Sequence, residues 1–136
     1  MRMLLVSIII SLMHVQPFHA DSKEFSQIAG DSIKSDVFRK VEASGENGVF
    51  EVTGEIRSNK KEFYYIVEDG HNELISEKKQ NVNTSHSQWA KFSFKLTLQK
   101  EDIPKNGTII LYLFEKNDKN QKSNTYPIVL VQMPTQ

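Results

Sequence analysis

The residues best able to do chemistry in this chain are few, and two histidines come first. Hydrolytic nucleophiles need a base held against them. His86 stands between Ser85 and Ser87 in a polar segment, and His71 follows an Asp-Gly pair. Adjacency in a loop supplies neither a held geometry nor an oxyanion site. We interpret both histidines as solvent-exposed loop residues, predict no catalytic residue, and do not expect an enzyme.

Metal and cofactor sites are also unsupported by the sequence. The chain contains no cysteine, which excludes disulfides, thiolate chemistry and cysteine-ligated zinc. Residues 117–120 offer oxygen donors, but they lack the spacing, the glycine and the terminal glutamate of an EF-hand loop. A solvated hairpin is the favoured interpretation. No glycine-rich nucleotide-binding motif occurs, so we predict no metal and no cofactor.

Aromatic residues and charge bear on binding. Tyr64 and Tyr112, with Phe63 and Tyr65, could form a stacking platform for sugars or nucleic acid, but in a small sandwich such residues are more often core and cross-strand pairs. Trp89 lies one residue out of phase with the apolar positions that follow it; capping the end of the core is favoured over an exposed functional role.

The 17 basic and 17 acidic residues balance, which argues against nucleic acid as a partner held mainly by overall charge.

Alternation of apolar and polar residues predicts the strands that must position any site. Residues 49–57 place Phe50, Val52, Gly54 and Ile56 on one face, and residues 89–98 place Ala90, Phe92, Phe94, Leu96 and Leu98 inward. This period of two marks half-buried antiparallel strands. Further strands are expected at residues 37–41, 63–67, 74–78, 108–114 and 128–131, the apolar runs at 63–67 and 108–114 being central. Seven short strands predict an all-β antiparallel sandwich.

Turn-forming residues separate these strands. Residues 45–48 and the Asp-Gly pair within residues 68–72 are hairpin signals. Residues 116–124 are predicted to be a long polar connection between the last two strands. Since sandwiches often carry function on loops, residues 81–88 and 116–124 are the candidate binding loops.

The first twenty residues have the layout of a secretory signal peptide. Arg2 precedes an apolar run at residues 4–13, and a small residue, Ala20, comes before the charged segment that begins at Asp21. The alternative is an uncleaved anchor, but a membrane-spanning helix needs about 20 apolar residues. We predict cleavage between Ala20 and Asp21, no stable membrane span after it, a leader at residues 21–35 and one domain at residues 36–136.

Residues 49–131 resemble the immunoglobulin-like domain of bacterial spore germination. The resemblance rests on Val-Thr-Gly-Glu-Ile at 52–56, Asp69-Gly70 with Leu74-Ile75, the Trp89 strand, Gly-Thr-Ile-Ile-Leu-Tyr-Leu-Phe-Glu at 107–115 and Pro-Ile-Val-Leu at 127–130. Two features of the family are missing: a proline shortly before the Val-x-Gly segment and an Asp-Gly in the last hairpin. The resemblance implies an immunoglobulin-like fold, an envelope setting in a spore-forming Gram-positive bacterium, and no catalytic residues.

Together these features predict a secreted, non-catalytic immunoglobulin-like binding module of the bacterial cell envelope. Its link to sporulation or germination comes from the resemblance alone. The partner would be an unidentified protein or cell-wall component. The alternative is an inhibitor of extracellular proteinases, because the chain also resembles bacterial proteinase-inhibitor domains of similar build. Residues 81–88 are the one plausible inhibitory loop, although neither a disulfide nor a proline stiffens it.

Overall fold

The computed structural model describes residues 35–84 and 88–133, which form seven strands and one short 3₁₀ helix. The elements are β1 Phe38–Glu46, β2 Val49–Ile56, β3 Glu62–Glu68, β4 Glu73–Asn81, β5 Ala90–Thr97, η1 Lys100–Asp102, β6 Gly107–Lys116 and β7 Lys122–Met133. The predicted all-β antiparallel sandwich is therefore confirmed. The predicted cleavage site at Ala20 and Asp21 and the Ser85-His86-Ser87 segment lie outside the described residues.

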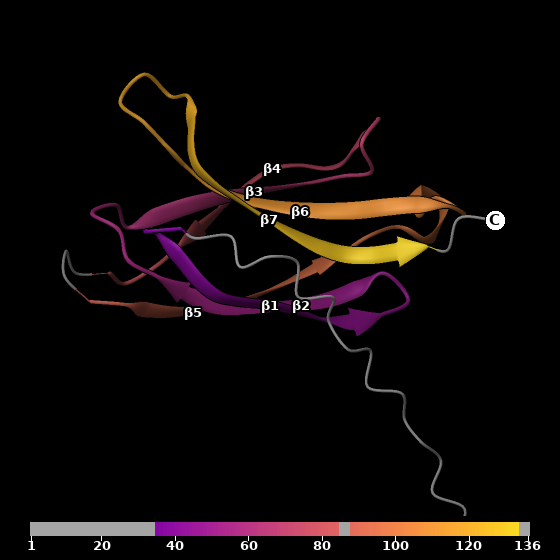
Figure 1. Ribbon diagram of the computed structural model, residues 1–136, viewed down its shortest axis with the longest axis horizontal. Helices are drawn as coiled ribbons and strands as arrows, with labels where there is room; N and C mark the ends of the chain where they lie inside the picture. Colours follow the sequence, from indigo (N-terminus) through magenta and orange to yellow (C-terminus); the bar gives the residue numbers. More distant parts are fainter. Residues whose placement is uncertain (1–34, 85–87, 134–136) are drawn as a thin grey trace, which may run out of the picture. The chain divides into compact units, whose positions relative to one another are not determined.

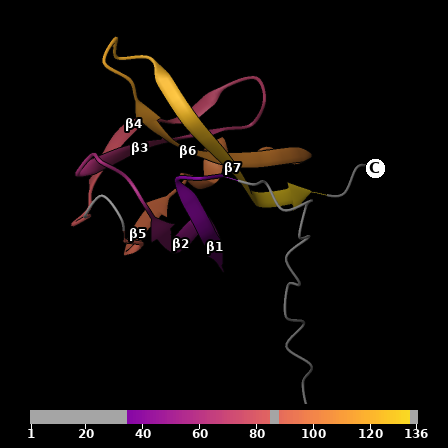
Figure 2. The ribbon, with the colours of Figure 1, turned by 60° about the vertical axis from the view of Figure 1, so that its left-hand side comes forward.

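The strands form two layers, a three-stranded sheet in the order β1-β2-β5 and a four-stranded sheet in the order β4-β3-β6-β7 (Figure 1; Figure 2). Every paired strand is antiparallel to its neighbour. The chain crosses between the sheets after β2, β4 and β5, and hairpins join the remaining consecutive strands. The fourth strand joins the larger sheet, whereas in the constant-type immunoglobulin arrangement it joins the first, second and fifth strands.

The core lies between the sheets and follows the predicted alternation. Phe50, Val52 and Ile56 of β2 are buried, and so are Phe92, Phe94 and Leu96 of β5. Phe63 and Tyr65 of β3, two members of the predicted aromatic set, are also buried. Their rings pack on the β5 phenylalanines, with a centroid distance of 4.9 Å for Phe63–Phe92 and 4.7 Å for Tyr65–Phe94. The core interpretation of Phe63 and Tyr65 is thus confirmed.

The hairpin turns have the residues that their backbone angles require. Glu46 pairs with Val49, so Asn47 and Gly48 alone form the β1–β2 turn, and both have positive φ. Asn-Gly is a favoured pair for this two-residue turn. In the β3–β4 turn, one carboxylate oxygen of Asp69 accepts hydrogen bonds from the backbone N–H groups of His71 and Asn72. These bonds hold the pKa of the Asp69 carboxyl below its ordinary value.

The predicted long connection at residues 116–124 is wrong. β6 runs to Lys116 and β7 begins at Lys122, so only residues 117–121 join them. The side-chain oxygen of Asn117 accepts from the backbone N–H groups of Lys119 and Gln121, and this closes the turn. Pairing in a sheet is made by backbone groups, so the polar segment after Lys122 can extend the ladder although it has no apolar pattern.

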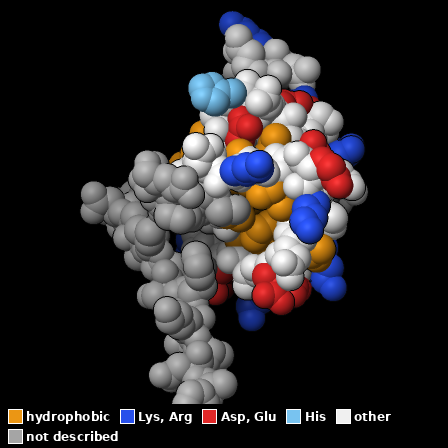
Figure 3. Space-filling model, turned by 90° about the vertical axis from the view of Figure 1, so that its right-hand side faces the viewer, with side chains coloured by type: hydrophobic (Ala, Val, Ile, Leu, Met, Phe, Trp, Pro, Cys, Tyr) orange, Lys and Arg blue, Asp and Glu red, His pale blue; other side chains and the backbone are white. Residues whose placement is uncertain are grey.

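At the end of the sandwich that carries the Asn47-Gly48 turn, hydrophobic side chains reach the surface among charged ones (Figure 3). Val49 is 49% exposed, and Ile103, which follows η1, is half-buried beside Gly48. The opposite end holds the candidate site.

Candidate functional site

Both segments predicted as binding loops contribute to the same end of the sandwich, where β2, β4 and β6 finish. We call it the pocket end. Val82 N–H donates to the Lys61 carbonyl at 2.9 Å, and the Thr84 hydroxyl donates to the Lys60 carbonyl at 2.9 Å. Asn124, from the other predicted loop, reaches Glu115 at this end. The choice of loops therefore led to the right region, although residues 122–124 belong to a strand.

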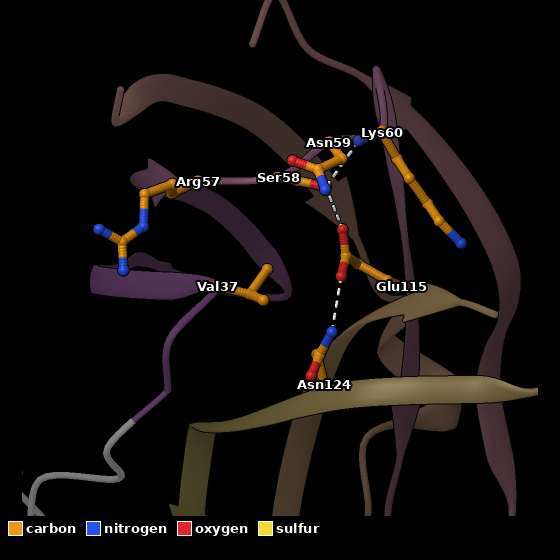
Figure 4. Close-up of a pocket in the computed structure, with 7 residues that line it drawn as sticks. All are labelled: Val37, Arg57, Ser58, Asn59, Lys60, Glu115 and Asn124. Carbon is orange, nitrogen blue, oxygen red and sulfur yellow. Dashed lines mark hydrogen bonds between the residues drawn. The ribbon is translucent and has the colours of Figure 1, made fainter. Parts of the chain in front are cut away.

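A polar pocket of about 340 Å³ opens at the pocket end (Figure 4). This volume lies at the lower limit of small-molecule sites. Seven residues from β6, β7, the segment before β1 and the β2–β3 connection line it: Val37, Arg57, Ser58, Asn59, Lys60, Glu115 and Asn124. The lining offers hydrogen-bond donors and acceptors with a single apolar side chain.

Glu115 is the buried acid of this pocket, with 6% of its surface exposed. The Ser58 hydroxyl donates to one carboxylate oxygen, and Asn124 Nδ2 donates to the other at 2.7 Å (Figure 4). Within residues 35–84 and 88–133, no Lys, Arg or His forms an ion pair with this carboxylate. A carboxylate has room for about four hydrogen bonds, so Glu115 can accept further donors from a ligand.

The connection that carries Ser58 is held in place by its own hydrogen bonds. Lys60 N–H donates to Ser58 Oγ at 2.9 Å, and the Lys60 ammonium donates to the Lys116 carbonyl. The Ser58 hydroxyl is thereby engaged on both sides, as an acceptor from Lys60 and a donor to Glu115. This wall of the pocket is ordered before any ligand arrives, which lowers the entropic cost of binding.

Trp89 lies beside the pocket, outside the core. Its ring is contacted by two guanidinium groups, Arg39 at 4.0 Å and Arg57 at 4.8 Å from the ring centre. Arg39 is oriented by Glu55, whose carboxylate accepts from Arg39 Nε at 2.6 Å. That hydrogen bond lowers the pKa of Glu55. Trp89 is not among the side chains packed on the core, so the favoured capping interpretation is wrong: its outward phase places it on the outer face of β5.

Arg57 joins the two features, because it lies over Trp89 and also lines the pocket. We call the combination of Trp89, Arg57, Ser58, Glu115 and Asn124 the Trp89–Glu115 site. It presents an aromatic ring, a cation, a buried carboxylate and an amide, which suits a polar ligand with donors and acceptors. Sequence analysis did not identify Glu115 or Ser58 as site residues. For Glu115 a signal was available in the sequence: this acid lies two positions after Leu113, which points into the core, so the strand period places it on the inward side.

The other candidate residues lie elsewhere. His71 is exposed in the β3–β4 turn, and Tyr64 stacks on Phe114, with ring centres 5.9 Å apart, beneath the Lys116 ammonium. In the part of the chain that the structure describes, no group of three or more His, Cys, Asp or Glu residues could hold a metal ion. Nor does any helix in that part have the length and apolar character to cross a membrane.

Neither protein-family models, nor curated proteins, nor solved structures give a match to this chain.

Proposed function

We propose that the chain is a secreted, non-catalytic, immunoglobulin-like binding module of the bacterial cell envelope, and that it binds a polar cell-wall component at the Trp89–Glu115 site. The observation that carries the proposal is the pocket itself, whose lining includes a buried carboxylate with spare acceptor capacity and also Arg57. Export and the link to sporulation or germination rest on the first twenty residues and on the family resemblance.

Several features support binding rather than catalysis. Ser58 is the one hydroxyl group among the pocket-lining side chains, and both of its hydrogen-bonding roles are taken by protein groups. Glu115 is hydrogen-bonded to neutral groups, an arrangement that orients a carboxylate for recognition. Cell-wall polymers are rich in hydroxyl and amide groups, which match the donors and acceptors of the lining.

The test uses the single tryptophan of the chain. Soluble fragments of Gram-positive cell walls would be titrated into the purified protein, and the fluorescence of Trp89 recorded. We expect a saturable change that is weakened in Arg57→Ala and retained in Lys95→Ala, a matched removal of a cation from an exposed position on β5. Absence of any change, together with no cosedimentation with intact cell walls, would contradict the proposal.

A second candidate function is inhibition of extracellular proteinases. It is supported by the two hydrogen bonds that tie Val82 and Thr84 to the β2–β3 connection, because an inhibitory loop must be held at its base. Incubation with a panel of secreted proteinases decides between the two functions. Stoichiometric inhibition of any of them would favour this alternative over cell-wall binding.

A further inference from the structure

The four edges of the two sheets are protected unequally. An exposed edge strand offers unpaired backbone groups to other chains, and proteins commonly block it with charges, bulges or prolines. β1 has a bulge between Arg39 and Glu42 and exposed charges. β5 exposes Lys91 and Lys95. β4 exposes several charges: Glu73, Glu77, Lys78 and Lys79.

β7 is the edge strand with the fewest charges. It is the longest strand, it forms the edge of the four-stranded sheet, and it has no charged residue from Ser123 to Met133. Val129 on this strand is 53% exposed. Two features interrupt this edge: Pro127, which pairs with Tyr112 and lacks an N–H group, and a register shift opposite Ile109 and Ile110, which leaves Leu130 as an extra residue on β7. Beyond Pro127, six residues of edge backbone extend over about 20 Å with neither charge nor proline.

We propose that this edge pairs with a second copy of the same chain. The β7 strands of two molecules would meet antiparallel across a two-fold axis, through residues 128–133, and would join two four-stranded sheets into one. A two-fold interface brings the same surface together from both molecules. An uncharged strand meets no like charge when it pairs with itself, and the balanced 17 basic and 17 acidic residues leave no net charge that keeps two copies apart.

The interface is small, so the association is weak. Six residues from each strand lie at the low end of specific interfaces, and we expect a dissociation constant on the order of 10 µM. The site at the pocket end stays accessible, because Asn124 precedes Pro127 and lies outside the pairing segment. Self-association and ligand binding are therefore separate properties, and the test of one does not depend on the other.

The test is sedimentation velocity of the full chain at concentrations from about 1 to 300 µM, a range that brackets the expected dissociation constant. We expect a monomer–dimer equilibrium. Val129→Lys should weaken it at least about tenfold, because a lysine on an edge opposes pairing. Val49→Lys is the matched control: Val49 is also an exposed valine, at 49%, but it lies on β2 beside the Asn47-Gly48 turn. It should leave the dimer unchanged.

Circular dichroism shows whether each variant folds, and hydrogen exchange provides a readout independent of substitution. Amides of residues 128–133 should gain protection as the concentration rises. A protein that stays monomeric over the whole range overturns the proposal. So does a dimer that Val129→Lys leaves intact, or one that Val49→Lys weakens equally. Concentration-independent protection in a monomer would show that another segment of the chain covers the edge, which also contradicts the proposal.

Discussion

Gly54 allows a central aromatic ring to occupy its place in the core. A Cβ atom built on Gly54 would lie 2.6 Å from Cζ and 3.0 Å from Cε1 of Phe92, and 3.1 Å from Cγ2 of Val41. The Phe92 ring has little freedom to move, because it packs against Phe63 and Phe94 at centroid distances of 4.9 and 6.2 Å. We predict that Gly54→Ala destabilises the protein.

Two opposing contributions set the magnitude. An added methyl group that forces core side chains out of place costs about 1–3 kcal/mol. Replacing glycine by alanine within a strand returns about 0.5–1 kcal/mol, because the unfolded chain loses backbone freedom. With the middle of each range, the net expected loss is about 1 kcal/mol. Since about 1 kcal/mol corresponds to a shift of roughly 4 °C in a domain of this size, the change is measurable.

Urea denaturation of four proteins would test the reasoning: the wild type, Gly54→Ala, Phe92→Leu and the double variant. Leucine removes the ring atoms that a Cβ at position 54 would meet, so in the Phe92→Leu background the alanine should be neutral or stabilising. The expected coupling energy is at least about 1 kcal/mol. Thr53→Ala, on the exposed face of the same strand, controls for general effects and should stay within about 0.5 kcal/mol. A stable Gly54→Ala, or coupling near zero, would refute the explanation.

Three further predictions concern electrostatics and the site. The pKa of Asp69 is lowered by folding, so its contribution to stability is complete above the ordinary value of 3.8 and is lost as the pH falls below it. In Asp69→Asn, the midpoint of urea denaturation should therefore fall less steeply with decreasing pH than in the wild type. Ser58→Ala removes the hydroxyl donor from the buried Glu115 and should cost about 1–3 kcal/mol in urea denaturation. Trp89→Leu removes two contacts with arginine, each worth about 0.5–1 kcal/mol, and should lower the thermal midpoint even without ligand.

The sandwich was predictable because its central strands carry their own pattern. In β2 and β5 the inward residues are apolar, although Gly54 and Ala90 are small, and the outward residues are polar except Val49 at the start of β2. A period of two is visible in sequence whatever the strand pairs with. The beginning of β7 has no such pattern. Residues 122–125 are held by pairing with β6, through Lys116–Lys122 and Glu115–Ser123, and their own side chains do not encode it.

The site was less predictable because its contacts join residues distant in sequence. Glu115 and Ser58 are 57 positions apart. Arg39 of β1 reaches Trp89, which immediately precedes β5, and β2 lies between β1 and β5 in the sheet. The outward phase of Trp89 was visible in the sequence, and it pointed to the outer face of β5. What the sequence did not show was that two arginines from other segments would cover the ring, and this depends on the order of strands in the sheet.

Irregularities of the backbone bring these distant residues together. Four residues other than glycine have positive φ, and two of them, Asn47 and Asn120, lie in hairpin turns where this is usual. The other two, Lys40 and Asn124, lie within strands, where positive φ costs energy.

Asn124 belongs to the Trp89–Glu115 site, and Lys40 adjoins Arg39, the residue that lies over Trp89. Lys40 lies in the β1 bulge, immediately after Arg39, and its ammonium is 3.4 Å from Glu55, the residue that orients Arg39. Asn124 lies opposite the register shift between Leu113 and Glu115, and its side chain binds the Glu115 carboxylate. Bulges redirect side chains and recur beside functional sites. Strained backbone persists where surrounding contacts maintain it. The positive φ of Lys40 and Asn124 is therefore a second argument for function at this end of the sandwich.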